Sequence, residues 1–187
     1  MRVRDFFGKL QEGRGRYKKQ ALIAIALLVA LLLFGTAIKP LLMITLLILV
    51  ASFSTFYHNF FRSPVNFELV KLATIISSVA YGSVVGILVG VSSDIIGRAL
   101  SGRFDQDTIT SLGAMVVIAI LAGMFRTANI SVLGIILVVV YYLMILPFLF
   151  IFGKDLARAS IYIGSNILFN ALLFMNVAPL VLNVMGH

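Results

Sequence analysis

The stretch TIISSVAYGSVVGILVGVSSDIIGRALSG, residues 74–102, decides the fold of this chain because small residues recur in it at every fourth position. The recurring positions, which end in an opposite-charge pair, are Thr74, Ser78, Gly82, Gly86, Gly90, Asp94, Arg98 and Gly102. In a helix, residues four apart lie on nearly the same face, so these positions form one narrow stripe. Small residues at this spacing let two helix backbones approach closely in lipid. The stripe therefore predicts a close helix contact, with Gly82, Gly86 and Gly90 as its packing residues.

The composition is that of an integral membrane protein. The 187 residues are 61% hydrophobic and the mean hydropathy is +1.10, whereas soluble domains are only about half apolar. Several apolar runs reach the roughly 18 residues that let a helix cross a hydrocarbon core of about 30 Å. The short alternating segments of a transmembrane β-barrel do not occur in the sequence. The expected fold class is all-α, a polytopic integral membrane helix bundle.

The residue types exclude several kinds of site. The chain has no cysteine and two histidines, which excludes disulfides, thiolate metal sites and histidine-rich metal sites. It contains no glycine-rich phosphate loop, no nucleophile elbow and no zinc-binding His-Glu-x-x-His motif. We therefore expect a protein that is not an enzyme and that holds no metal and no cofactor.

Positive charge gathers at the N-terminus. The net charge is +8, and residues 1–19 hold seven of the 15 lysines and arginines. Such a segment beside a transmembrane helix typically faces the cytoplasm and the anionic headgroups, so nucleic acid is not an expected partner. Residues 1–19 are predicted to form a basic cytoplasmic tail, with Phe6, Phe7 and Leu10 as the apolar side of an interfacial helix. Residues 20–187 are the transmembrane domain, in the cell membrane.

The apolar runs predict seven helical segments, with six spans as the alternative. The segments are 20–38, 41–58, 66–101 with a break at Tyr81-Gly82, 109–125, 130–152 and 157–184. Unbroken, the third run would form a helix of about 50 Å, longer than one crossing. Glycine at position 82 is its weak point. With seven spans and the tail inside, most loop arginines and lysines lie on the cytoplasmic side and the C-terminus is external.

Local signals set the ends of the later helices. Asp107 or Thr108 is expected to cap the helix that follows the polar loop. Asn129 or Ser131 is expected to start the next helix. Pro147 lies well inside an apolar run and is expected to kink that helix.

Asp94 and Arg98 form an acidic–basic pair at i,i+4 spacing within the apolar run. Charges near a membrane core are expensive, and they mark a pathway, a binding site or a structural pair. Arg98 is close enough to the end of the run for its guanidinium to reach the interface. Two interpretations therefore stand side by side: a salt bridge that holds a helix end, and a solute or proton site.

A row of polar residues also marks the last segment, where Tyr162, Asn166 and Asn170 lie four apart. Asparagine at membrane depth needs a partner, so the row either packs against a neighbouring helix or hydrogen-bonds a ligand. Together with Asp94 and Arg98, these three are the candidate substrate-binding residues. Glu68 and Lys71, three apart, are expected to pair at the membrane interface.

The segment YGSVVGILVGVSSDIIG, residues 81–97, resembles the substrate-binding S components of energy-coupling-factor vitamin transporters. In those proteins a Tyr-Gly-x-x-x-Gly turn joins two short helices, and a small-residue helix then ends near an aspartate. Residues 119–126 resemble the next helix end, and Ala26 and Ala30 are similar to the Ala-x-x-x-Ala pair that docks the first helix on the coupling subunit. The resemblance covers 66–184 and implies a six-span fold that captures a small molecule and binds membrane partner subunits.

The rod-shape protein family MreD, thought to share that fold, is similar in Gly90-x-x-x-Asp94 and in its last helix with asparagine and proline. This resemblance implies a non-catalytic membrane scaffold. A small channel or lipid transporter is a third hypothesis for the function. If the break at Gly82 matches that of S components, the six-helix core begins at the second segment and Ala26 and Ala30 lie outside it. A solute-binding protein should enclose Asp94 or the asparagines in a pocket. A scaffold should bury them against one another and leave a small-residue groove open to lipid.

Overall fold

The computed structural model describes residues 38–56, 65, 67–102 and 104–186. The chain divides into two compact units, Met1–Leu42 and Met43–His187, and the second holds nearly all of the described structure. The basic tail, the predicted packing residues Ala26 and Ala30, and the first expected segment up to residue 37 lie outside the described residues.

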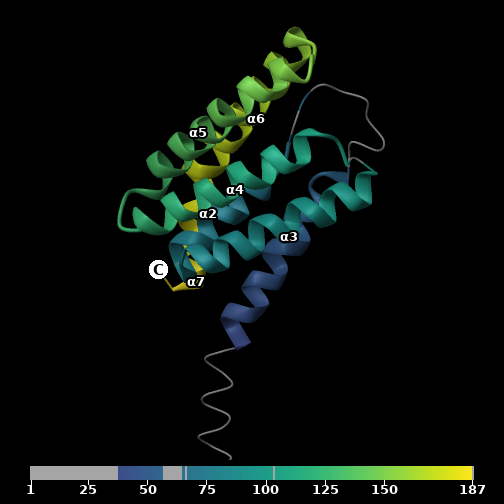
Figure 1. Ribbon diagram of the computed structural model, residues 1–187. Coiled ribbons are helices and arrows are strands. Elements are labelled where there is room, and N and C mark those ends of the chain that lie inside the picture. Colours follow the sequence, from purple (N-terminus) through teal and green to yellow (C-terminus); the bar gives the residue numbers. More distant parts are fainter. Residues whose placement is uncertain (1–37, 57–64, 66, 103, 187) are drawn as a thin grey trace, which may run out of the picture. The chain divides into compact units, whose positions relative to one another are not determined.

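The described residues are all-helical and contain no strand, which confirms the predicted fold class (Figure 1). The helices are Ile38–Phe53, α2 (Val70–Tyr81), α3 (Ser83–Ser101), α4 (Asp107–Met124), α5 (Ile130–Ile151), α6 (Leu156–Asn176) and α7 (Ala178–Met185). Among the described residues, four helices are long and apolar enough to cross a membrane: Ser83–Ser101, Asp107–Met124, Ile130–Ile151 and Ala157–Asn176. The chain is therefore a membrane helix bundle.

The run from residue 66 to 101 is broken at Gly82. Helix α2 ends at Tyr81 and α3 begins at Ser83, while Gly82 has φ 94° and ψ 162°. Glycine adopts this backbone conformation without the steric penalty that a Cβ brings. The Gly82 N–H still donates to Ser78 O at 2.9 Å, so α2 closes its last turn before the chain reverses.

The reversal folds the small-residue stripe onto itself. Gly86 faces Ser78, and a Cβ at Gly86 would lie 2.7 Å from the Ser78 Cβ. Four residues further from the turn on each side, Gly90 faces Thr74, and a Cβ at Gly90 would also lie 2.8 Å from Met115 Cγ of α4. Glycine at positions 86 and 90 therefore lets the α2 and α3 backbones lie in direct contact, with α4 closing over Gly90.

Helix α2 is the centre of the bundle, because α3, α4, α5, α6 and α7 all contact it. Every residue of α2 from Val70 to Val79 is buried. The outer face of α3, in contrast, carries exposed apolar side chains such as Val84 (72% exposed) and Leu88 (60%). Exposed apolar side chains on this face favour contact with lipid tails over contact with water.

Two expected helix ends differ in the structure. The last segment is two helices, because α6 ends at Asn176 and Pro179 begins α7 as one of its first two residues. Proline lacks the N–H that a helix interior needs, but it is well suited to a first turn. The residue before α4 is Gln106, with no side-chain cap. Thr108 instead accepts a hydrogen bond from the Asp105 N–H at 3.1 Å.

Three other local expectations can be compared directly. Asn129 is the N-cap of α5, as predicted, and its side chain accepts from the backbone N–H groups of Ser131 and Val132. Helix α5 continues through Pro147 to Ile151 without ending. The helix Ile38–Phe53 stops short of residue 58, where the second segment was expected to end.

Candidate functional site

Asp94 and Arg98 form the ion pair that their spacing on α3 predicts. The Arg98 Nε donates to both oxygens of the Asp94 carboxylate at 3.0 Å. The Arg98 Nη1 donates to Thr108 Oγ1 at 3.2 Å, which ties the end of α3 to the start of α4. The Asp94 side chain is 5% exposed and that of Arg98 is 20% exposed, so the pair leads from the edge of the bundle to its interior.

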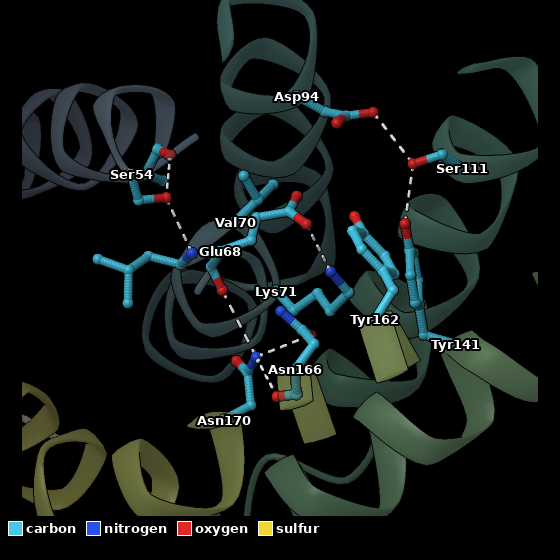
Figure 2. A network of polar contacts seen from close by, with 12 residues as sticks. Ser54, Glu68, Val70, Lys71, Asp94, Ser111, Tyr141, Tyr162, Asn166 and Asn170 are labelled. Atoms are coloured by element: carbon cyan, nitrogen blue, oxygen red, sulfur yellow. Dashed lines mark hydrogen bonds and ion pairs between the residues drawn. The ribbon is translucent and has the colours of Figure 1, made fainter. Parts of the chain in front are cut away.

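Two residues that the sequence did not single out extend this pair inward. Ser111 of α4 donates to Asp94 Oδ2 at 3.1 Å, and its Oγ lies 2.8 Å from the Tyr141 hydroxyl of α5 (Figure 2). A serine has one hydroxyl hydrogen and an ionised carboxylate only accepts, so Ser111 donates to Asp94. Tyr141 must then donate to Ser111. The hydrogen bonds run in one direction, toward Asp94.

A second ion pair, Glu68–Lys71, is buried beside Tyr141. The Lys71 Nζ lies 3.0 Å from Glu68 Oε2, with side-chain exposures of 1% and 9%. It also lies 4.6 Å from the centre of the Tyr141 ring and 5.2 Å from that of Tyr142, within the range of cation–π attraction. The predicted contact between Glu68 and Lys71 is confirmed, and its place at the membrane interface stays a prediction. The i,i+3 contact forms, but the other helices enclose α2 and its first turn.

The segment before α2 is held from two sides. The Leu69 N–H donates to Ser54 Oγ at 2.9 Å, and Asn170 Nδ2 donates to the Glu68 carbonyl at 3.5 Å. Non-helical backbone within a membrane domain needs such partners, because lipid offers none. These contacts hold the backbone that carries Glu68, whose carboxylate pairs with Lys71.

Asn166 and Asn170 of α6 are fully buried and bonded to each other. The Asn170 Nδ2 lies 3.0 Å from both Asn166 O and Asn166 Oδ1, in addition to its contact with Glu68 O. In the described part of the chain, no hydrogen-bond donor reaches the buried Asn170 Oδ1. Tyr162, on the same face of α6, is half-buried against the apolar core. The structure thus places the α6 row beside the Glu68–Lys71 pair (Figure 2).

We call this set the polar cluster. Its members are Glu68, Lys71, Asp94, Arg98, Ser111, Tyr141, Asn166 and Asn170. They come from five helices and from the segment before α2, and they carry two positive and two negative charges. The cluster can exchange ion pairs and hydrogen bonds with a polar molecule. Among the described residues, no group of three or more His, Cys, Asp or Glu side chains could hold a metal ion.

No family model, no curated protein and no solved structure matches this chain. The resemblance to S components and to MreD therefore remains a prediction from short motifs, and the geometry of the polar cluster carries the functional reasoning.

Proposed function

We propose that this protein binds a small polar solute among helices α2 to α6, as a substrate-binding membrane protein of the S-component kind. The observation that supports the proposal is the polar cluster itself, above all the buried Asn170 Oδ1 that has no donor among the described residues. A buried acceptor without a donor costs about 1–3 kcal/mol. A solute that supplies an N–H or O–H donor recovers that free energy on binding.

The charge content of the cluster supports a functional role. Replacing a buried ion pair by apolar side chains of similar volume is often neutral or stabilising, so such a pair is weak support for a purely structural role. Here two pairs, Glu68–Lys71 and Asp94–Arg98, lie in an apolar helix bundle. Ionisable side chains inside membrane domains typically line binding sites and pathways.

The test is native mass spectrometry of the full chain, extracted and sprayed in mild detergent. We expect a retained small molecule that is lost in Asp94→Ala and weakened in the isosteric Asp94→Asn, which keeps the shape of the site. The matched control is Asp155→Asn, because Asp155 is an exposed carboxylate at the α6 N-terminus, outside the cluster. Retention in this control together with loss in Asp94→Ala supports the proposal. Absence of any small molecule, with partner proteins co-purifying instead, contradicts it.

A membrane scaffold of the MreD type is the second candidate, and a specific observation favours it. Asp94, Arg98 and Ser111 satisfy one another by hydrogen bonds, as expected of a structural network. The open small-residue groove expected of a scaffold is not where the sequence placed it, because Ser78 and Thr74 of α2 cover Gly86 and Gly90. Partner subunits would have to bind another surface, and co-purification in the experiment above would identify them.

We also propose that the chain resides in the cell membrane with its N-terminus in the cytoplasm, on the charge asymmetry of its sequence. The chain has no cysteine, so single cysteines can report topology without background. Gln11→Cys and His187→Cys are treated in intact cells with a membrane-impermeant maleimide. Seven spans predict labelling at residue 187 alone, and six spans predict labelling at neither position. Labelling at residue 11 contradicts the proposed orientation.

A further inference from the structure

The turn between α5 and α6 is tied to the start of α4 by one lysine. The Lys154 Nζ lies 3.5 Å from Asp105 Oδ2 and 3.4 Å from Asp107 Oδ1. Both distances exceed the roughly 2.7–2.9 Å of a charge-assisted hydrogen bond, and the Lys154 side chain is 41% exposed. Exposed ion pairs contribute little free energy and are screened by salt. The contact therefore favours one arrangement of the two segments but opens readily.

The part of the α5–α6 hairpin that carries Lys154 is loosely packed. Between residues 146 and 165 no described side chain is buried, whereas Ile145 of α5 and Asn166 of α6 are buried. Helix α6 contacts α2, α5 and α7 and, within the described residues, neither α3 nor α4. Pro147 lies where this segment begins, and it cannot donate the backbone hydrogen bond that would stiffen α5 there. We call residues 146–165 the arm, and its packing is that of a segment able to move.

The contact continues from the surface to the polar cluster. The Asp105 N–H donates to Thr108 Oγ1 at 3.1 Å, and the Arg98 Nη1 donates to the same oxygen at 3.2 Å. Arg98 in turn holds Asp94, whose side chain is 5% exposed. Through Asp105, Lys154 is therefore connected to Thr108, which joins the end of α3 to the start of α4.

One side chain of the arm faces the interior. Tyr162 packs against the buried core, and its hydroxyl points in the same direction as that of Tyr141 (Figure 2). We infer that Lys154 is an electrostatic clasp. When it leaves Asp105 and Asp107, the arm parts from the start of α4, and the polar cluster opens to water at this end of the bundle. The inference rests on the proposed solute-binding function, to which it adds the place where the site opens.

The experiment is hydrogen–deuterium exchange, read by mass spectrometry, on the purified full chain in mild detergent. Lys154→Met should speed exchange about threefold or more in the peptides that cover residues 107–112 and the arm. Salt at about 0.5 M screens exposed charges, so it should do the same to the unaltered chain and have no further effect on Lys154→Met. Lys154→Arg keeps the charge and should exchange like the unaltered chain.

The matched control is Arg158→Met, which removes the same charge from the same arm. Arg158 pairs with Asp155, within the arm, at 3.7 Å, and its side chain is 84% exposed. This variant should leave exchange at residues 107–112 unchanged, because it breaks no contact between the arm and α4.

A single cysteine reports whether the cluster itself opens. The chain has no cysteine, so Ser111→Cys, at a position that is 3% exposed, is treated with a water-soluble methanethiosulfonate. Adding Lys154→Met should raise its labelling rate about threefold or more, whereas adding Arg158→Met should not. Ala114→Cys, at a buried alanine of α4, is the second probe if Ser111→Cys fails to fold.

The outcomes separate the clasp from the proposed function. Exchange in Lys154→Met that matches the unaltered chain, or that rises equally in Arg158→Met, overturns the clasp. Faster exchange without faster labelling overturns the opening of the cluster. Neither measurement needs a solute, so both results leave the proposed function intact. That function fails instead if native mass spectrometry finds no retained small molecule, whatever the clasp does.

Discussion

Replacing Gly86 with alanine should destabilise the protein, because the α2 and α3 backbones touch at this residue. A Cβ at position 86 would lie 2.7 Å from Ser78 Cβ and 3.0 Å from Ser78 Cα. Carbon atoms prefer separations of about 3.5–4.0 Å, so the helices must part by about 1 Å. Overpacking of this kind costs about 1–3 kcal/mol. Alanine recovers about 0.5–1 kcal/mol as a better helix former, which leaves a net loss of about 0–2.5 kcal/mol, with the middle of that range expected for so close a contact.

The measurement is thermal unfolding of the purified chain in one detergent. For a chain of this size, 1 kcal/mol corresponds to about 2–4 °C in Tm. Gly86→Ala should therefore lower Tm by several degrees. The matched controls are Gly113→Ala and Gly164→Ala, since these helical glycines would have nothing within 4 Å of a new Cβ. Without a clash the same substitution gains about 0.5–1 kcal/mol, so both controls should raise Tm.

A second substitution tests whether the contact with Ser78 causes the loss of stability in Gly86→Ala. Removing the opposing side chain with Ser78→Gly should rescue Gly86→Ala, so that the double variant is more stable than the sum of the single effects by about 0.5–3 kcal/mol. Two results would refute the reasoning. One is Gly86→Ala with the stability of Gly113→Ala. The other is strict additivity with Ser78→Gly. Either would mean that the two helices do not meet at this point.

Three further predictions use the same unfolding assay. Gly82→Ala should cost about 1–3 kcal/mol, because an alanine is strained at φ 94°; a variant as stable as the unaltered chain would show that the turn has another conformation. Lys71→Met should cost about 3–5 kcal/mol by removing the cation that pairs with the buried Glu68 carboxylate, whereas Glu68→Gln/Lys71→Met should recover most of the loss. A double variant no more stable than Lys71→Met would contradict burial of the pair. Ser111→Ala and Tyr141→Phe should be coupled by about 0.5–3 kcal/mol in a double-mutant cycle, since the two hydroxyls share a hydrogen bond; additive effects would contradict that bond.

The sequence predicted the features that depend on neighbours along the chain. The break at Gly82 follows from a glycine placed where one helix would outrun the membrane. The Asp94–Arg98 contact follows from i,i+4 spacing within a single helix. The cap at Asn129 is equally local. Such features need only the geometry of one turn or one helix.

The features that were missed depend on which helices come together. Glu68 and Lys71 lie at the end of an apolar run and therefore resemble an interfacial pair, but five helices enclose α2 and bury them. Ser111 follows the polar residues Thr108 and Thr110 at the start of α4, and Tyr141 adjoins Tyr142 in α5. Only the packing of α4 against α5 and α3 gives Ser111 and Tyr141 their partners. Their one sequence signal was a hydroxyl group on an apolar helix. That pattern is too common in membrane helices to identify a site.

The shortness of α2 has a consequence for how the protein enters the membrane. Its 12 residues extend about 18 Å by helix rise, against a hydrocarbon thickness of about 30 Å. On its own it would expose Lys71 and the unpaired backbone of its ends to lipid. Its small-residue face is covered only when α3 folds back at Gly82. During synthesis α2 is therefore unsuited to leave the translocation machinery by itself, and the two arms of the hairpin should be released into the bilayer as one unit.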